Sequence, residues 1–393
     1  MLEIKSKIIL KKIFKNIENK IWLKTIKYNK NLQNKLDISI EDYKKYNQIE
    51  FEIEPNNKFD KIFINCKVEF DPFVHISIDN NKNYLNTFII DDVFCLKKIK
   101  IIIDPEIKSL KGFFKNSEYI EELKCMKFNR RDITDLSEMF SGCKYLKYLD
   151  ISKFKTDNVT DMSCMLYNCR SLMNINLSNF NTKKVINMQN MFDQCSKLKE
   201  LNLNNFDTSN VIHMNDMFYD CTNLNELNIE NVRIDNAINI SYMFYNCKAL
   251  EKLEALNFKD NKVIDMSYIF YNCKRLRQIK MPDINTSKAT NMSGMFYKCE
   301  RLNSIDISNL VIKDKCRIKN MFSKCNNILQ KLVKEKFNIF NEIAFGHIED
   351  DNDIYTETFE VSLLNGNSFY HNEISISDIT IDKEYFDSLF YNE

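Results

Sequence analysis

Thirteen cysteines are the residues with the most chemical potential in this chain, because a thiolate acts as a nucleophile, a ligand for soft metals and a disulfide partner. Eight of them recur at a constant interval of 26 residues: Cys143, Cys169, Cys195, Cys221, Cys247, Cys273, Cys299 and Cys325. Stacked repeats would bring neighbouring Cα atoms within disulfide reach. No CxxC pair or histidine accompanies the series, however, so the pattern favours buried packing over metal binding or redox chemistry.

The rest of the sequence offers no catalytic motif. The chain has only five glycines, which excludes a phosphate-cradling loop, and no nucleophile motif is present. Its four histidines are scattered, and none stands at ligand spacing from a cysteine or carboxylate: His75, His213, His347 and His371. The sequence therefore predicts a protein that is not an enzyme and that holds no cofactor or metal.

Each periodic cysteine ends a short apolar pattern that predicts a helix. Met188, Met191 and Phe192 precede Cys195 by seven, four and three residues, which is the spacing of one helix face. One residue ahead of this stripe stand side chains that are mostly hydrogen-bond acceptors and are predicted to be helix N-caps: Asp135, Asp161, Asn187, His213, Asn239, Asp265 and Asn291.

The residues after each cysteine predict a strand. Leu198, Leu201 and Leu203 follow Cys195, and the last two alternate at the period of a strand. A phenylalanine, a threonine and a valine then lead into the next repeat. Because one strand and one short helix bury only one face each, the units must stack in register. We expect an α/β repeat solenoid of about eight or nine leucine-rich-repeat-like coils over residues 101–330.

The repeat resembles a known class. The segment NMQNMFDQCSKLKELNLNNFDTSNV is similar to the BspA-like leucine-rich repeats, the surface-protein type with 26 residues per unit. The resemblance implies a leucine-rich-repeat fold and, as one alternative function, a cell-surface adhesin. No stretch has the ~18 apolar residues of a membrane helix, and lysines interrupt the first apolar clusters. We expect a cytoplasmic protein without a membrane span.

The two ends predict small capping modules. Residues 1–46 are predicted to be helical and resemble an F-box at Ile13, Phe14, Ile17, Trp22, Leu23 and Tyr28, although the opening Leu-Pro of that family is missing. The resemblance implies docking on a Skp-type adaptor, and hence an alternative function as a substrate adaptor of a ubiquitin ligase. Residues 47–100 predict a small β-rich cap, and residues 331–393 a C-terminal helix followed by an acidic β-hairpin.

The outward positions of the predicted strands are the candidate binding face, because stacking gathers them into one sheet. We predict contacts at Tyr148, Asp150, Met173, Asn176, Asn202, Glu226 and Asn228. The Asn and Asp column admits two interpretations, a side-chain ladder that supports the sheet or a binding surface. The net charge is +1, and neither end of the chain is basic and aromatic enough to indicate binding of nucleic acid. The function predicted is a monomeric scaffold for an unidentified protein partner.

Overall fold

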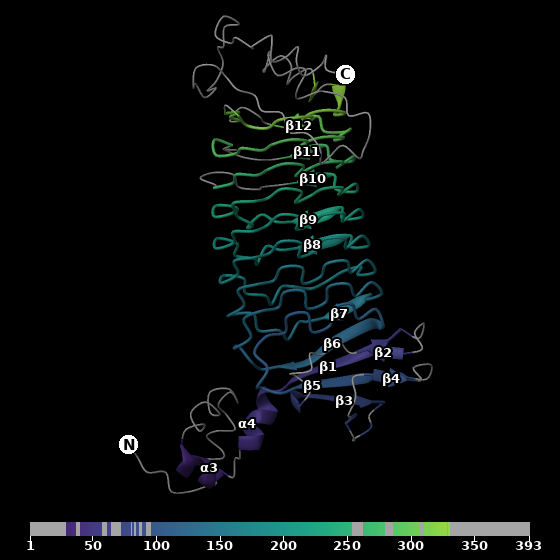
Figure 1. The fold of residues 1–393 in the computed structure, drawn as a ribbon, viewed down its shortest axis with the longest axis vertical. Coiled ribbons are helices and arrows are strands. Elements are labelled where there is room, and N and C mark those ends of the chain that lie inside the picture. Colours follow the sequence, from purple (N-terminus) through teal and green to yellow (C-terminus); the bar gives the residue numbers. More distant parts are fainter. Residues whose placement is uncertain are drawn as a thin grey trace, which may run out of the picture.

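The computed structural model describes residues 29–36, 40–56, 61–63, 72–79, 81, 84–85, 89–91, 96–253, 262–279, 286–305, 310–313, 315–327 and 329–330. Two short helices, α3 (Lys30–Leu36) and α4 (Ile40–Asn47), lie at the N-terminal end of a tall stack of coils (Figure 1). Within these residues no helix combines the length and the apolar character needed to cross a membrane.

A five-stranded sheet covers the first coil. Its strands are β1 (Ile49–Pro55), β3 (Val74–Ile78), β5 (Ile99–Ile103), β6 (Ile120–Phe128) and β7 (Tyr148–Asp150), in the order β3-β5-β1-β6-β7. Along β1, Ile49, Phe51 and Ile53 are fully buried, as the alternation of FEIE requires. A separate antiparallel pair joins β2 (Lys61–Phe63) to β4 (Ile89–Asp91).

The direction of pairing changes at β6. Strand β6 has two neighbours. β1 runs antiparallel to it, whereas β7 runs parallel to it with Leu123 opposite Leu149. The covering sheet therefore continues directly into the parallel strands of the repeats, and the first coil has no open edge toward the N-terminal side.

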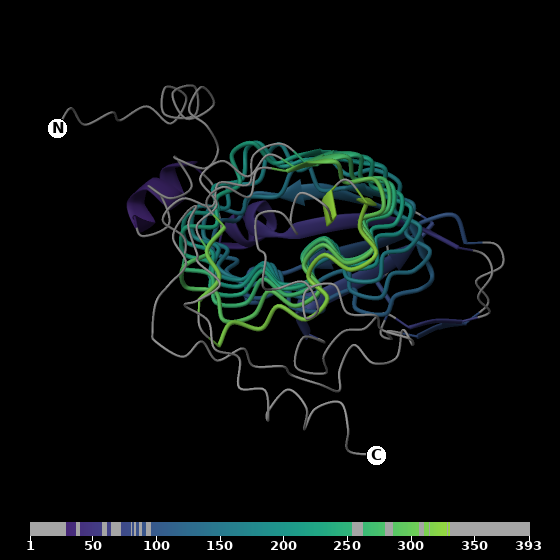
Figure 2. The same ribbon diagram turned by 90° about the horizontal axis from the view of Figure 1, so that it is seen from above.

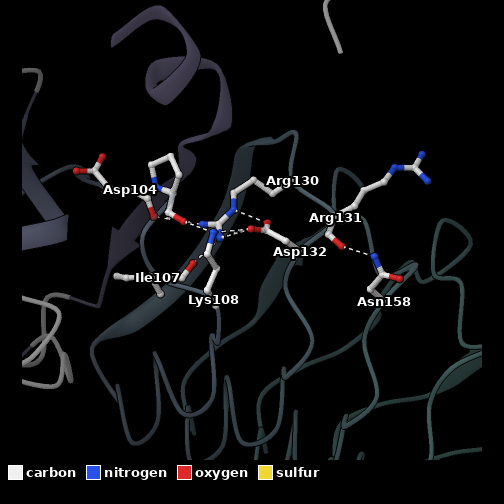
Figure 3. A network of polar contacts seen from close by, with 8 residues as sticks. Asp104, Ile107, Lys108, Arg130, Arg131, Asp132 and Asn158 are labelled. Carbon is white, nitrogen blue, oxygen red and sulfur yellow. Dashed lines mark hydrogen bonds and ion pairs between the residues drawn. The ribbon is translucent and has the colours of Figure 1, made fainter. Parts of the chain in front are cut away.

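A buried arginine ties the covering sheet to the first coil (Figure 3). Arg130 is 2% exposed, and its Nε donates to Asp132 Oδ1 at 2.9 Å while its Nη1 donates to the carbonyl of Asp104, which follows β5, at 3.2 Å. Lys108 Nζ donates to the second oxygen of Asp132 at 2.7 Å. Burial raises the pKa of Asp132, but hydrogen bonds from Arg130 and Lys108 outweigh it and lower that pKa to about 2.

Beyond β7 the chain forms coils that stack in parallel (Figure 1), and from above they superpose on one shared outline (Figure 2). Their strands are short: β8 (Glu200–Asn202), β9 (Glu226–Asn228), β10 (Lys252–Leu253), β11 (Gln278–Ile279) and β12 (Ser304–Ile305). Leu201 pairs with Leu227 and Ile279 with Ile305, so neighbouring coils keep the 26-residue register. The prediction of a repeat protein with a recurring strand is confirmed.

The prediction of a helix before each cysteine is wrong. Two tight turns replace it, in which Met165 N donates to Met162 O at 3.3 Å and Cys169 N donates to Leu166 O at 3.2 Å. These bonds span three residues, whereas an α-helix would need bonds that span four. The apolar spacing is the same in both cases, because consecutive turns also bring every third or fourth side chain inward.

The neighbouring coil explains why turns form instead of a helix. Cys164 N donates to Gln189 O at 2.9 Å, and Asn168 N donates to Asp193 O at 2.7 Å, so alternate N–H groups bond outside their own coil. Cys164 and Asn168 have φ values of 53° and 60°, the left-handed conformation that the third residue of such a turn adopts. Gly294 holds the equivalent place, where an added Cβ would lie 2.4 Å from the ring of Tyr268.

Columns of identical side chains fill the core between the two sides of each coil. Phe192, Phe218 and Phe244 stack with ring centroids 5.6 and 5.3 Å apart, and all three are fully buried. A second column joins Phe180 to Phe206 at 6.4 Å. Each unit thus buries its aromatic rings mainly against those of its neighbours, which is why a single repeat cannot fold alone.

Candidate functional site

The cysteine column is part of the core. Cys169 Sγ donates to Phe140 O at 3.2 Å and Cys221 Sγ donates to Phe192 O at 3.1 Å, each reaching back to the preceding coil. Burial raises the pKa of the Cys143 thiol to about 12, so the group stays protonated and keeps its donor. All cysteines in the described residues are free thiols, and no cluster of three metal-binding side chains occurs among those residues.

The residues predicted as helix N-caps instead cap turns. Asp161 Oδ1 accepts hydrogen bonds from the backbone N of Ser163 at 2.8 Å and from its Oγ at 2.6 Å. Asn187 Oδ1 accepts from Gln189 N at 3.1 Å in the same way. The acceptor role inferred from the sequence is therefore present, but it holds the entry of the first tight turn because no helix follows.

The strand face carries the predicted contact residues on several coils. Tyr148 and Met173 are 47% and 36% exposed. The oxygens of Asp150, Asn176 and Asn202 each accept a hydrogen bond at 3.0 Å from the backbone N–H two residues later, so this column closes the turn after each strand. These hydrogen bonds lie within one coil and do not join neighbouring coils, so both the supporting ladder and the binding surface stay predictions.

A groove of about 720 Å³ crosses the strand face over β8, β9 and the start of β10. It is lined by Asn174, Ile175, Glu200, Leu201, Asn202, Asn225, Glu226, Leu227, Asn228, Ile229, Glu230, Glu251 and Lys252. The groove brings together three of the predicted contacts, Asn202, Glu226 and Asn228. The other four, Tyr148, Asp150, Met173 and Asn176, do not line it.

Sequence reasoning missed several acidic residues of the groove, namely Glu200, Glu230 and Glu251. Glu200 and Glu226 follow their cysteines by the same five residues, and they face each other across β8 and β9. That equal spacing was the available signal. Asn228 differs from Asn176 and Asn202 of its column because its Oδ1 is buried and has no hydrogen-bond partner among the described residues.

A second exposed feature, an isoleucine stripe, follows the stack away from the strands. Ile186, Ile238 and Ile264 are 45%, 41% and 45% exposed, and Ile212 lies between the first two in the column. Backbone bonds hold them in register, since Ile212 N donates to Ile186 O at 2.8 Å and Ile264 N donates to Ile238 O at 2.8 Å. The predicted adaptor contacts Ile13, Phe14, Ile17, Trp22, Leu23 and Tyr28 lie outside the described residues.

Parallel coils of constant length, side-chain columns and a polar groove define a repeat protein. The chain belongs to the family described as "Mycoplasma protein of unknown function, DUF285", whose model matches residues 108–201, 171–259 and 253–348, more than half of the 393 residues. Among solved structures, the chain is similar to the crystal structure of a T. pallidum leucine-rich repeat protein, with 15% identity, a TM-score of 0.26, and coverage of 49% of this chain and 70% of the other. No curated protein matches.

Proposed function

We propose that this protein is a non-enzymatic protein-interaction scaffold, a leucine-rich-repeat-like solenoid that holds a protein partner on its strand face. The observation that carries the proposal is the groove over β8 and β9, whose lining combines strand residues with exposed polar side chains. Interfaces combine an apolar centre with a polar rim. Leu201, which is 3% exposed, and the half-buried Ile175 and Leu227 supply the centre, while exposed Asn and Glu side chains supply the rim.

The rigidity of the groove supports this function. Strand backbones on both sides are fixed by the pairing of Leu201 with Leu227, and Asn202 holds the following turn through its contact with Asn204 N. A surface that is ordered before binding loses less conformational entropy when the partner arrives. The groove therefore offers a preformed contact area rather than one that must be assembled.

Site-directed photo-crosslinking tests the proposal directly. A photo-reactive side chain replaces Asn225, which is exposed and lines the groove, in the full chain expressed in its native cell. The matched control carries the same group at Lys183, an exposed residue that does not line the groove. We expect a defined protein to be captured from position 225 and not from position 183.

The same experiment distinguishes the alternatives derived from the sequence. Equal capture at positions 225 and 183, or no capture at position 225, would contradict the scaffold function of this face. Recovery of a Skp-type adaptor that is lost on substitution of Ile13, Phe14 and Trp22 would support the ubiquitin-ligase adaptor instead. Labelling of the protein on intact cells would support the adhesin.

A further inference from the structure

The groove differs from the N-terminal end of the stack in the ion pairing of its glutamates. Near the N-terminal end, Glu118 pairs with Lys144 at 2.5 Å and Glu121 pairs with Lys147 at 2.6 Å, each across one coil. In the groove, by contrast, the carboxylates form no ion pair with any side chain in the described ranges of the chain: Glu200, Glu226, Glu230 and Glu251.

The arrangement also sets like charges side by side. Glu200 and Glu226 occupy directly opposed positions of the parallel strands β8 and β9, and both side chains are exposed. Like charges in such positions oppose strand pairing, whereas a basic residue at either place would favour it. Lys252 is the one basic residue in the lining, against four glutamates. The free protein thus keeps a local excess of negative charge that a cationic partner would neutralise.

The groove wall contains a further unmet polar group. Asn228 Oδ1 is buried and accepts no hydrogen bond from the described residues. This atom lies inside the protein, so the acceptors that a partner can reach are the exposed carboxylates of the lining. These unpaired carboxylates accept hydrogen bonds, and lysine and arginine side chains supply N–H donors in excess.

From this geometry we infer that the groove binds a lysine- or arginine-rich segment of a protein partner. The inference rests on the proposed scaffold function and names the chemistry of the partner at the same site. The lining residues come from successive coils, so an extended segment that crosses the coils places its basic side chains over Glu200, Glu226 and Glu251 in turn. Charge complementarity of this kind determines specificity and association rate more than it does affinity.

A peptide-binding measurement tests this chemistry. The full chain is titrated against a fluorescent peptide of alternating lysine and glycine, and separately against the corresponding glutamate and glycine peptide, with anisotropy as the readout. We expect binding of the basic peptide only, weakening as salt is raised because exposed charges are screened within about 10 Å at 0.1 M salt. The double variant Glu200→Gln/Glu226→Gln should bind at least fivefold more weakly.

The control removes the same number of charges elsewhere. Glu118→Gln/Glu121→Gln changes the net charge equally but acts on carboxylates that are already paired, so it should leave peptide affinity within twofold of the parent. Equal loss in both double variants, or equal binding of the acidic peptide, would overturn the inference. Thermal unfolding of each variant verifies that the stack remains folded, and neutralising the opposed glutamates should not lower its midpoint.

The two proposals fail differently. If photo-crosslinking at position 225 captures a protein whose yield is unchanged in Glu200→Gln/Glu226→Gln, the groove is an interface but its partner is not recognised by basic residues. The scaffold function would then stand and this inference would fall. If position 225 captures nothing and the lysine peptide does not bind, both proposals fail together.

Discussion

The covering sheet and the coil stack are held together by different patterns of hydrogen bonds. In the sheet, β6 spans nine residues and pairs with β1 over most of its length. In the stack, strands are two or three residues long, and side chains complete the contacts between coils. Thr182 Oγ1, for example, donates to Asp207 O at 2.9 Å, and Asn205 Nδ2 donates to Phe180 O at 2.9 Å. The sheet depends on a continuous backbone ladder, whereas the stack combines scattered backbone bonds between turns with its side-chain columns.

The largest test of this difference removes one ring from a column. Phe218→Ala deletes a fully buried ring stacked on both sides, and it should reduce the free energy of unfolding by about 3–5 kcal/mol. Hydrogen exchange should show the loss of protection concentrated in the coils on either side, because contacts in a stack are local.

Phe51→Ala is the matched substitution in the covering sheet, where the ring is also fully buried. Its loss of protection should extend along β1, β5 and β6, since these strands share one ladder. The same spatial pattern of hydrogen exchange in both variants would contradict the proposed difference between the sheet and the stack.

A smaller effect is expected from a buried carboxyl in the stack. Asp193 is 5% exposed, and burial together with the charges of Asp216 and Asp220 raises its pKa to about 7, against hydrogen bonds from Asn190 and Gln194 that lower it. The folded protein therefore binds this proton more tightly than the unfolded chain, so stability falls as pH rises from about 4 to 7. The loss between pH 5 and 8 should be about 2–3 kcal/mol.

Asp193→Asn removes this titration and should flatten the pH dependence measured by urea unfolding at pH 5 and pH 8. The junction between the covering sheet and the first coil provides the opposite case, because Asp132 has its pKa lowered to about 2. Its contribution is present above about pH 4 and is lost as pH falls toward 2. An unchanged slope between pH 5 and 8 in Asp193→Asn would show that another group carries the effect.

The smallest difference concerns the thiols. Cys221→Ala removes a fully buried side chain whose Sγ lies 3.1 Å from its acceptor, and about 1–2 kcal/mol should be lost. Cys125, on β6, is equally buried, but its Sγ is 3.7 Å from Lys127 O. Cys125→Ala should therefore cost less in chemical denaturation. Equal costs would mean that the thiol bonds between coils contribute nothing beyond packing.

Much of the stack could be predicted because its core is periodic. The spacing of Leu201 and Leu203 identified the strand, and the fixed interval between cysteines identified the register. The helix was wrong because the spacing of Met188, Met191 and Phe192 fits two turns as well as one helix face. Asn168 and Gly294, which tolerate left-handed φ values, were the signals that favoured turns.

The groove was harder to predict than the core. Exposed positions are not constrained by burial, so the period places Glu200, Glu226 and Asn174 in one outward column but does not locate the groove along it. Tyr148 and Met173 are the large apolar side chains among the predicted contacts, but the groove begins at Asn174 and lies mainly over the next two coils. Its location depends on how neighbouring side chains differ in size from coil to coil, which is a property of the assembled stack.

The constant register has a consequence for how such a chain can change in length. Every bond between coils joins residues about one period apart, from Cys164 N to Gln189 O to the pairing of Leu201 with Leu227. Inserting one residue would displace every column at once. Duplicating or excising a complete unit would leave each column continuous and would only lengthen or shorten the groove, so partner reach can vary by whole coils while the core chemistry stays the same.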